Sequence, residues 1–241
     1  MRLDIFLAEK GLADSRTEAK NLITSGAVTV MGKCVTKPSF DVDEEISDVA
    51  VDRSIKKYAS RGGIKLEGAI SAFEINPSGR LAIDIGASSG GFTDCLLQNG
   101  AKHVISVDSG SGQLVDRIRE DSRVTVFENY NARYMKSSDF EYTPNLAVMD
   151  VSFISATYII PAVYEILADG ADFVCLIKPQ FEVGRQGVRK GGIVKSEKQR
   201  LAAVSKVTDF AKSVGFKVIA LTESSIHGGD GNIEYLAHFK K

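Results

Sequence analysis

The stretch "RLAIDIGASSGGF", Arg80 to Phe92, contains the transition that decides the fold. Leu81 to Ile85 is a short apolar run typical of a buried strand, and the small residues Gly86 to Gly91 follow it before a helical pattern begins. Small residues let a backbone approach a ligand closely, and open α/β sheets bind ligands where their strands end. The stretch therefore predicts a strand, a ligand-binding turn and a helix.

Strand-like and helix-like segments alternate from this stretch to the end of the chain. Such alternation is typical of a doubly wound, mainly parallel sheet, so we predict an α/β fold. The predicted strands are Leu81 to Ile85, His103 to Asp108, Val124 to Phe127, Leu146 to Asp150, Phe173 to Lys178, Phe216 to Thr222 and Ile233 to Phe239. The predicted helices are Gly91 to Asn99, Ser111 to Arg119, Ser155 to Leu167 and Glu197 to Val214.

The residues that precede this domain follow a different pattern. Ser15 and Glu18 have the spacing of a capping box and Gly26 lies where a helix would end, which predicts one helix between them. "AVTV" and "CVT" alternate on either side of "MGK", which predicts a β-hairpin. We expect a small α+β module at residues 1–52, a polar linker at 53–60 and a large domain at 61–241.

Basic residues of the small module form a candidate phosphate-binding face. Arg16 and Lys20 are four positions apart and share a helical face, and Arg2, Lys33 and Lys37 can join them. Acidic residues dilute this signal, among them Asp4, Glu9, Asp14 and Glu18. Composition alone therefore leaves two alternatives open, an RNA-binding face and an ordinary solvated surface.

Composition limits the class of protein. The chain has 241 residues, 44% hydrophobic and 25% charged, and a net charge of -1, so it is globular and has no global attraction for polyanions. It has no apolar run of the roughly 18 residues that cross a bilayer and no signal peptide, so we expect a cytosolic protein. The three cysteines and three histidines lack metal-site spacing, so we expect reduced packing cysteines and no metal.

The small-residue loop lies between two strand-end acids, Asp84 and Asp108. Ser88 stands where a dinucleotide fingerprint has its second glycine, and the loop lacks the Lys-Ser/Thr of a phosphate-binding P-loop. A carboxylate at Asp84 would repel pyrophosphate and favour a cation, while Asp108 is placed to accept from the hydroxyls of a ribose. A nucleoside with a sulfonium, S-adenosylmethionine, suits this site better than NAD. The alternative is a glycine-rich turn that binds no ligand.

The segment "DFVCLIKPQFE", Asp172 to Glu182, is a buried strand that ends in a lysine. The side chain of Lys178 must leave the sheet at its carboxyl end, where ligands bind. It is either a functional ammonium or a lysine that has reached solvent, and exposed lysines are the commoner case.

Six segments resemble one known family: "YASRGGIKLEGAI", "DIGASSGGFTDCLLQNGA", "VDSGSGQL", "VMDVSFIS", "LIKPQFEVGRQGV" and "GGDGNIEYLAHF". They are similar to those of the TlyA family, whose members carry the names hemolysin A and ribosomal RNA 2'-O-methyltransferase. The resemblance implies an amino-terminal S-four RNA-binding domain and an FtsJ-like catalytic domain with a Rossmann-like, seven-stranded sheet. It also implies methyl transfer from S-adenosylmethionine to cytidine ribose in small- and large-subunit ribosomal RNA.

The resemblance also implies a catalytic tetrad, which falls on Lys65, Asp150, Lys178 and Glu234. Lys178 is the candidate base, because removal from water and a second ammonium at Lys65 would both favour its neutral amine. Asp150 would orient Lys178, and Glu234 would hold Lys65 or the target ribose. The expected cofactor-binding residues are Asp84, Gly86, Ser88, Gly90, Asp108, Tyr130 and Asn131.

The residues from Pro179 to Ser196 are expected to form a long basic loop that closes over RNA. Its expected RNA contacts are Arg185, Arg189 and Lys190, in addition to the five basic residues of the small module. His227 lies in a loop near Glu234 and either touches substrate or belongs to an ordinary turn. Two other classes of function remain open, a non-catalytic RNA-binding factor and a membrane-active hemolysin.

Overall fold

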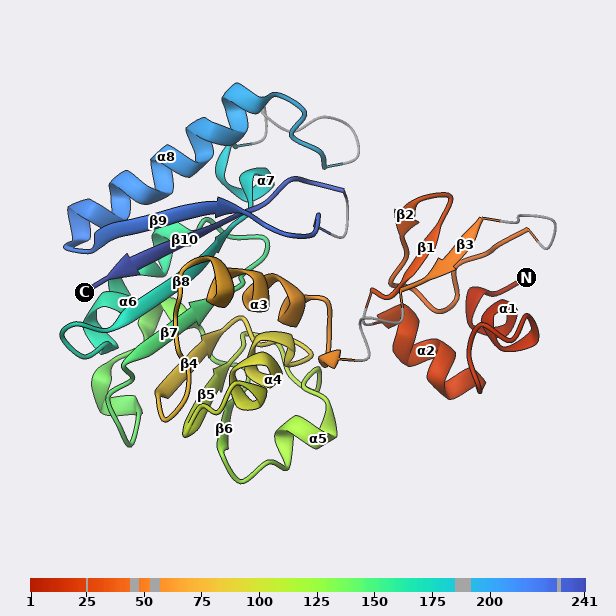
Figure 1. Ribbon diagram of the computed structural model, residues 1–241, viewed down its shortest axis with the longest axis horizontal. Helices are drawn as coiled ribbons and strands as arrows, with labels where there is room; N and C mark the ends of the chain where they lie inside the picture. The colour runs from red at the N-terminus through yellow and green to blue at the C-terminus, as the bar shows by residue number, and fades with distance from the viewer. Residues whose placement is uncertain (25, 44–47, 53–56, 185–191, 229–230) are drawn as a thin grey trace.

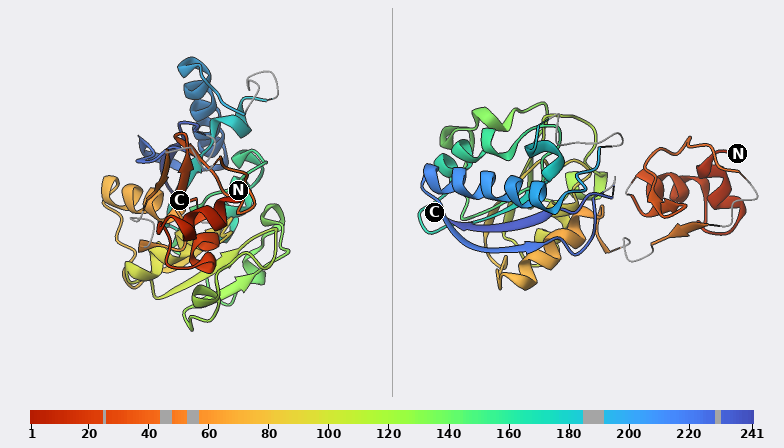
Figure 2. Two further views of the ribbon diagram at one scale, coloured as in Figure 1. Left: turned by 90° about the vertical axis from the view of Figure 1, so that its right-hand side faces the viewer. Right: turned by 90° about the horizontal axis from the view of Figure 1, so that it is seen from above.

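The computed structural model describes residues 1–241 except 25, 44–47, 53–56, 185–191 and 229–230. The chain forms a small amino-terminal body and a large α/β body, which lie side by side along the longest axis of the molecule (Figure 1). The amino terminus lies at the far end of the small body and the carboxyl terminus at the opposite end of the large one (Figure 2).

The small body contains helices α1 (Leu3–Glu9) and α2 (Arg16–Thr24) and strands β1 (Val28–Val30), β2 (Lys33–Cys34) and β3 (Val49–Val51). The strand order is β2-β1-β3, and β1 pairs antiparallel with both neighbours. Met31 and Gly32 have φ values of 51° and 71°, the left-handed geometry of the turns that join tight hairpins. The predicted helix and hairpin are confirmed, whereas α1 and β3 were not predicted.

The large body is built on a seven-stranded sheet with the order β6-β5-β4-β7-β8-β10-β9. Strands β4 to β8 are mutually parallel, and β10 is antiparallel to both β8 and β9. The strand bounds are β4 Leu81–Ile85, β5 His103–Val107, β6 Val124–Phe127, β7 Leu146–Met149, β8 Asp172–Ile177, β9 Lys217–Glu223 and β10 Tyr235–Lys240. The predicted doubly wound, mainly parallel sheet is confirmed.

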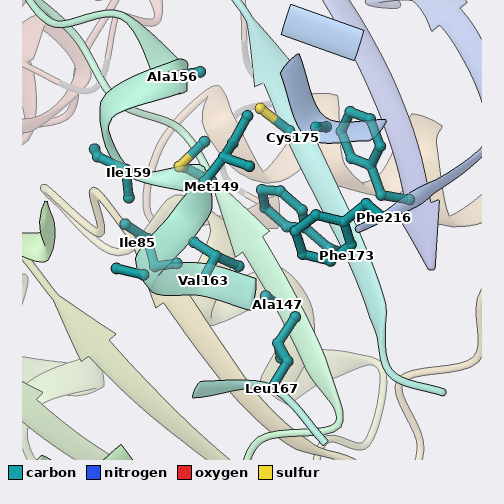
Figure 3. Packing of buried hydrophobic residues seen from close by; sticks show 14 of the residues in the cluster. Ile85, Ala147, Met149, Ala156, Ile159, Val163, Leu167, Phe173, Cys175 and Phe216 are labelled. Atoms are coloured by element: carbon teal, nitrogen blue, oxygen red, sulfur yellow. The ribbon is translucent and has the colours of Figure 1, made fainter. Parts of the chain in front are cut away.

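Helices cover both faces of this sheet. Successive side chains along its strands point to opposite faces, and each face has its own apolar core. Ile83 and Ile85 of β4 pack beneath α6 (Ile160–Ile166) and α8 (Glu197–Val214), whereas Ala82 packs against the other core. Figure 3 shows the first core, in which Ile159 and Val163 lie over Ile85 and the rings of Phe173 and Phe216 lie beside one another. The second core is covered by α3 (Gly62–Ala72), α4 (Gly91–Gln98) and α5 (Asp116–Arg119).

Three predicted segments differ from the structure in extent. The helix expected from Ser111 is only the one-turn α5, and the helix expected from Ser155 is divided into η4 (Ala156–Tyr158) and α6. Pro161 explains the division, because proline fits the first turn of a helix and not its interior. The expected loop after Lys178 begins with a one-turn helix, α7 (Pro179–Glu182). Two further short helices of the described part are η2 (Ala132–Tyr134) and η3 (Ser137–Asp139).

The two bodies meet at the residues that precede α3. Arg61 donates from Nη1 to the carbonyl of Gly26 at 3.4 Å and from Nη2 to the carbonyl of His227 at 2.9 Å. Tyr58 is buried in the core of the large body, and the amide of Ala59 donates to the carboxylate of Asp94 at 2.7 Å. The end of the predicted linker is thus packed against the large body.

Across the described part of the chain, helices are too short or too polar to span a bilayer.

Candidate active site

The small-residue loop after β4 follows a path that requires glycine. Gly86 and Gly90 have φ values of 86° and 94°, where side chains are rarely tolerated. A Cβ atom on Gly86 would lie 2.3 Å from the carbonyl oxygen of Asp150, so the loop passes directly against the end of β7. The glycines thus bring the loop to the carboxyl edge of the parallel strands.

A cavity of about 560 Å³ lies beside this loop, a volume in the usual range for small-molecule sites. Asp108 lies in its wall, and its two oxygens accept from the amides of Ser88 at 2.8 Å and Gly110 at 2.7 Å. These bonds fix the carboxylate and leave lone pairs free, as vicinal ribose hydroxyls require. Gly86, Gln113, Tyr130 and Asn131 lie in the same wall.

Tyr130 and Asn131 are both held by local contacts. The Tyr130 hydroxyl donates to Asp139, and its ring packs edge-on against Phe127 with centroids 5.6 Å apart. The side chain of Asn131 accepts from the amide of Arg133 at 3.2 Å. The structure therefore places both residues in the cavity wall where a nucleoside base can contact them.

Asp84 lies beneath the loop and not in the wall of this cavity. It is fully buried, and one carboxylate oxygen accepts from the Thr93 hydroxyl at 2.6 Å. The other oxygen has no hydrogen-bond partner among the described residues, and burial raises the pKa of Asp84 to about 7. Asp84 thus lies beneath the loop, and its expected part in cofactor binding stays a prediction.

The four tetrad residues form two ion pairs at the same edge of the sheet. Lys178 Nζ lies 2.5 Å from Asp150 Oδ1, and Lys65 Nζ lies 2.5 Å from Glu234 Oε2. The second pair is deeply buried, with side-chain exposures of 9% for Lys65 and 2% for Glu234. The structure thus places Asp150 beside Lys178, as expected, and pairs Glu234 with Lys65, one of its two expected partners.

A second cavity, of about 260 Å³, contains Lys65, Asp150 and Lys178 in its wall, together with His227. It shares Gly86, Ser88, Asp150 and Ser152 with the first cavity, so the two are contiguous. Three of the four tetrad residues, Lys65, Asp150 and Lys178, therefore border a space contiguous with the cavity of Asp108, which is the arrangement needed for transfer between a bound nucleoside and a second substrate.

Several site residues escaped the sequence analysis. Ser152 accepts a hydrogen bond from Lys178 Nζ at 2.8 Å, whereas the close Asp150 Oδ1 is not aligned for one. Phe153 is 92% exposed and has a φ of 65°, a strained value for a side chain of this size. Gln180 donates to Glu234 Oε1 at 3.2 Å. Ser152 and Phe153 follow Asp150 in "DVSF", which was the available signal.

The basic residues of the small body are surface-exposed, and two of them are oriented by a buried acid. Arg2 and Arg16 donate to opposite oxygens of Asp4 at 2.9 and 3.0 Å, and they hold the pKa of Asp4 down at about 2. Lys20, Lys33 and Lys37 are also exposed. The other expected RNA contacts, Arg185, Arg189 and Lys190, lie outside the described residues.

The fold and the two contiguous cavities define a methyltransferase of the Rossmann-like class, whose cofactor is S-adenosylmethionine. The family model of FtsJ-like methyltransferases matches residues 58–241, and that of the S4 domain matches residues 1–45. The chain belongs to the FtsJ-like methyltransferase family and, within it, to the TlyA group.

Relatives match almost the whole chain. "16S/23S rRNA (cytidine-2'-O)-methyltransferase TlyA" of Mycobacterium tuberculosis is 40% identical over 97% of this chain and 87% of its own length. "Hemolysin A" of Brachyspira hyodysenteriae is 43% identical over 99% of both chains. A solved structure from Streptococcus thermophilus, also named as a hemolysin, has a TM-score of 0.79 and 43% identity, over 100% of this chain and 88% of that one.

Proposed function

We propose that the protein transfers a methyl group from S-adenosylmethionine to the ribose 2'-hydroxyl of a cytidine in ribosomal RNA of one or both subunits. The observation that carries this proposal is the Lys178–Asp150 pair: Asp150 lies in the wall of both the cofactor cavity and the substrate cavity, and Lys178 lies in the wall of the substrate cavity. The Mycobacterium tuberculosis relative is named for this activity on 16S and 23S rRNA.

The residues around the first cavity suit the cofactor. Asp108 would accept from its ribose hydroxyls, and Tyr130 and Asn131 would border its adenine. Gly86 and Ser88 line this cavity and would lie beside the methionine part of the cofactor, and Gly90, where a Cβ would meet Leu114, would hold the loop on this path. When bound, S-adenosylmethionine supplies a methyl group on a positively charged sulfur.

The tetrad would move the proton that this reaction releases. A ribose hydroxyl is a weak nucleophile until it loses its proton to a positioned base. Lys178, in its neutral amine form, would accept this proton while the 2'-oxygen takes the methyl group and the bond from that methyl to the cofactor sulfur breaks. Asp150 lies 2.5 Å from the resulting ammonium and would stabilise it. Ser152, whose hydroxyl accepts from Lys178, would keep the amine directed at the ribose.

The Lys65–Glu234 pair would shape the other side of the ribose site. Lys65 lies in the wall of the substrate cavity and Glu234 holds it through a 2.5 Å bond. A buried ammonium fixed in this way would stabilise the negative charge that develops on the 2'-oxygen. Its role is therefore electrostatic and separate from the proton transfer to Lys178.

RNA would be bound by both parts of the chain. We propose that residues 1–52 dock on folded ribosomal RNA through Arg2, Arg16 and the exposed lysines, and that residues 61–241 carry the catalysis. The target nucleotide must leave its helix to reach Lys178, and a base turned out in this way is usually held by stacking. Phe153, exposed and three residues after Asp150, is placed to stack on it. This activity would take place in the cytoplasm.

The test is transfer of labelled methyl from S-adenosylmethionine to separated, unmodified ribosomal subunits, with the label mapped to base or ribose. Wild-type protein should label a cytidine 2'-oxygen, and Lys178→Ala should abolish the label. Lys198→Ala, at an exposed lysine of α8, is the matched control and should keep it.

Two results would contradict the proposal. If neither subunit accepts methyl although cofactor binding is confirmed, a non-catalytic RNA-binding role is supported. Leakage of liposomes by the pure protein would instead support the hemolysin activity named for the Brachyspira relative.

A further inference from the structure

We propose that Glu182 is a positioning residue, which aligns the two loops that carry Asp150 and Lys178. This inference rests on the proposed function, because it assigns Glu182 to the same site. Glu182 closes α7, four residues after Lys178, and its side chain is only 2% exposed. It lies in the wall of neither cavity, so any effect on the reaction must act through other residues.

The contacts of Glu182 join the two loops. One carboxylate oxygen accepts from the amide of Ala156 at 2.7 Å, and the other accepts from the Ser155 hydroxyl at 2.6 Å. Ser155 and Ala156 begin η4, directly after the loop that starts at Asp150. A single carboxylate thus ties the end of the Lys178 loop to the end of the Asp150 loop.

Lys206 of α8 makes this link a charged one. Its ammonium donates to Glu182 Oε2 at 2.9 Å and to the carbonyl of Glu182 at 3.0 Å. A buried carboxylate needs such a partner, because an unpaired charge in the protein interior is strongly unfavourable. The same ammonium lies 3.4 Å from the Ser155 hydroxyl, so one side chain of α8 contacts the end of the Lys178 loop and the end of the Asp150 loop.

The loop that Glu182 anchors carries the groups nearest the reaction. Val151 to Ile154 belong to no helix or strand, so their path depends on the two ends of the segment. One end is held by the amide of Asp150, which donates to the carbonyl of Ile85 at 2.9 Å. The other end is held by Glu182. Between them lie Ser152, which accepts from Lys178, and the strained Phe153.

Loss of the anchor at the far end would let Ser152 and Phe153 shift, and with them the part of the cofactor cavity wall that residues 151–154 form. The opposite wall would stay in place. Asp108 and the small-residue loop, which shape that cavity, make none of the contacts of Glu182. We therefore expect a large defect in the rate of methyl transfer and only a small one in the binding of cofactor, because Asp108 and the small-residue loop keep their places.

The test compares Glu182→Gln with Asp172→Asn in the full chain. Asp172 is the matched control: its side chain is 10% exposed and is bonded by Arg80, His238 and Lys240, but it lies at the other end of β8 from Lys178. With RNA and cofactor saturating, Glu182→Gln should slow methyl transfer by about ten-fold or more, as small misplacements of reacting groups do. Its affinity for S-adenosylhomocysteine should stay within about two-fold of wild type. Asp172→Asn should keep the wild-type rate.

Hydrogen exchange gives a readout that needs no RNA. In the Glu182→Gln protein, the peptide that spans residues 151–158 should exchange faster than in wild type, because the bond to the Ala156 amide weakens. In Asp172→Asn it should not. Ser155→Ala removes one of the two loop contacts and should show a smaller change in the same direction, which keeps the test available if Glu182→Gln fails to fold.

Three outcomes would overturn the inference: equal rates for the two acid variants, a loss of cofactor affinity that accounts for the whole defect, or unchanged exchange in residues 151–158. If the wild-type protein itself transfers no methyl to ribosomal RNA, the proposed function fails. The exchange experiment then still decides whether Glu182 positions the loop.

Discussion

Replacing Glu234 by glutamine tests how far the fold depends on the buried Lys65–Glu234 pair. The substitution keeps the size of the side chain and an acceptor for Lys65, but it removes the charge that balances a lysine with 9% side-chain exposure. Removal of one partner from a buried ion pair typically costs about 3–5 kcal/mol of unfolding free energy. We expect about 3 kcal/mol, the lower end of that range, because the amide oxygen still accepts from Lys65.

The double variant Lys65→Met/Glu234→Gln should recover most of this loss. It buries no charge, and Gln180, which donates to Glu234 at 3.2 Å, keeps an acceptor. Lys65→Met alone should be as damaging as Glu234→Gln, because it leaves a carboxylate with 2% exposure unpaired. The pair should therefore show a coupling free energy of about 4 kcal/mol or more, above the usual range for contacting residues.

The assay is urea unfolding followed by circular dichroism, since the chain has no tryptophan to report by fluorescence. Each single variant should lower the urea midpoint by about 1 M, given the usual dependence of unfolding free energy on urea. The double variant should unfold close to wild type and yet transfer no methyl, which separates the contribution to stability from the contribution to catalysis. Additive losses in the double variant, or single variants that unfold like wild type, would refute the reasoning.

Three further changes should have effects that follow from single contacts. Gly86→Ala should abolish binding of S-adenosylhomocysteine in calorimetry, because its Cβ would lie 2.3 Å from the carbonyl oxygen of Asp150; retained affinity would contradict the proposed cofactor cavity. Burial raises the pKa of Asp84 from 3.8 to about 7, so the folded protein favours the protonated carboxyl. As pH rises from about 4 to 7, the unfolding free energy of wild type should therefore fall relative to that of Asp84→Asn, by at most about 4 kcal/mol. Unfolding curves at a series of pH values measure this difference. Asp4 has a pKa lowered from 3.8 to about 2, so its stabilisation is present above pH 4 and lost as pH falls toward 2. Asp4→Asn should lower the unfolding free energy of the small body by about 1 kcal/mol at neutral pH, a modest loss because Arg16 is half exposed and its ion pair is screened by solvent. At pH 2 the loss should be small. Amide hydrogen exchange in the small body measures both.

Sequence patterns predicted the elements whose signals are local. The helix α8 matches its predicted bounds from Glu197 to Val214, because the Ser196 hydroxyl accepts from the amide of Gln199 at its start and Gly215 takes a positive φ at its end. The helix α1 was missed because its first residue is preceded by Arg2, which makes no side-chain cap. Its stability comes from packing against α2, which no local pattern reveals.

The candidate site was predictable where it depends on strand ends. Asp150 and Lys178 follow β7 and β8, which are adjacent and parallel, so their meeting follows from the order of the sheet. The partner of Lys65 was one of two alternatives, because Glu234 lies 169 positions away and only the three-dimensional fold shows that the two meet. The hydrogen bond from Ser155 to Glu182 could not be predicted from the sequence, because no local pattern around "KPQFE" indicates whether this glutamate is buried or exposed.

The place of β10 in the sheet has a consequence for biosynthesis. This strand comes after β9 in the chain but lies between β8 and β9, and Glu234 immediately precedes it. A nascent chain that ends before this point lacks the partner of Lys65 and leaves the edge of β8 open. The site is therefore completed only after β10, which is synthesised later than β8 and β9, has inserted between them.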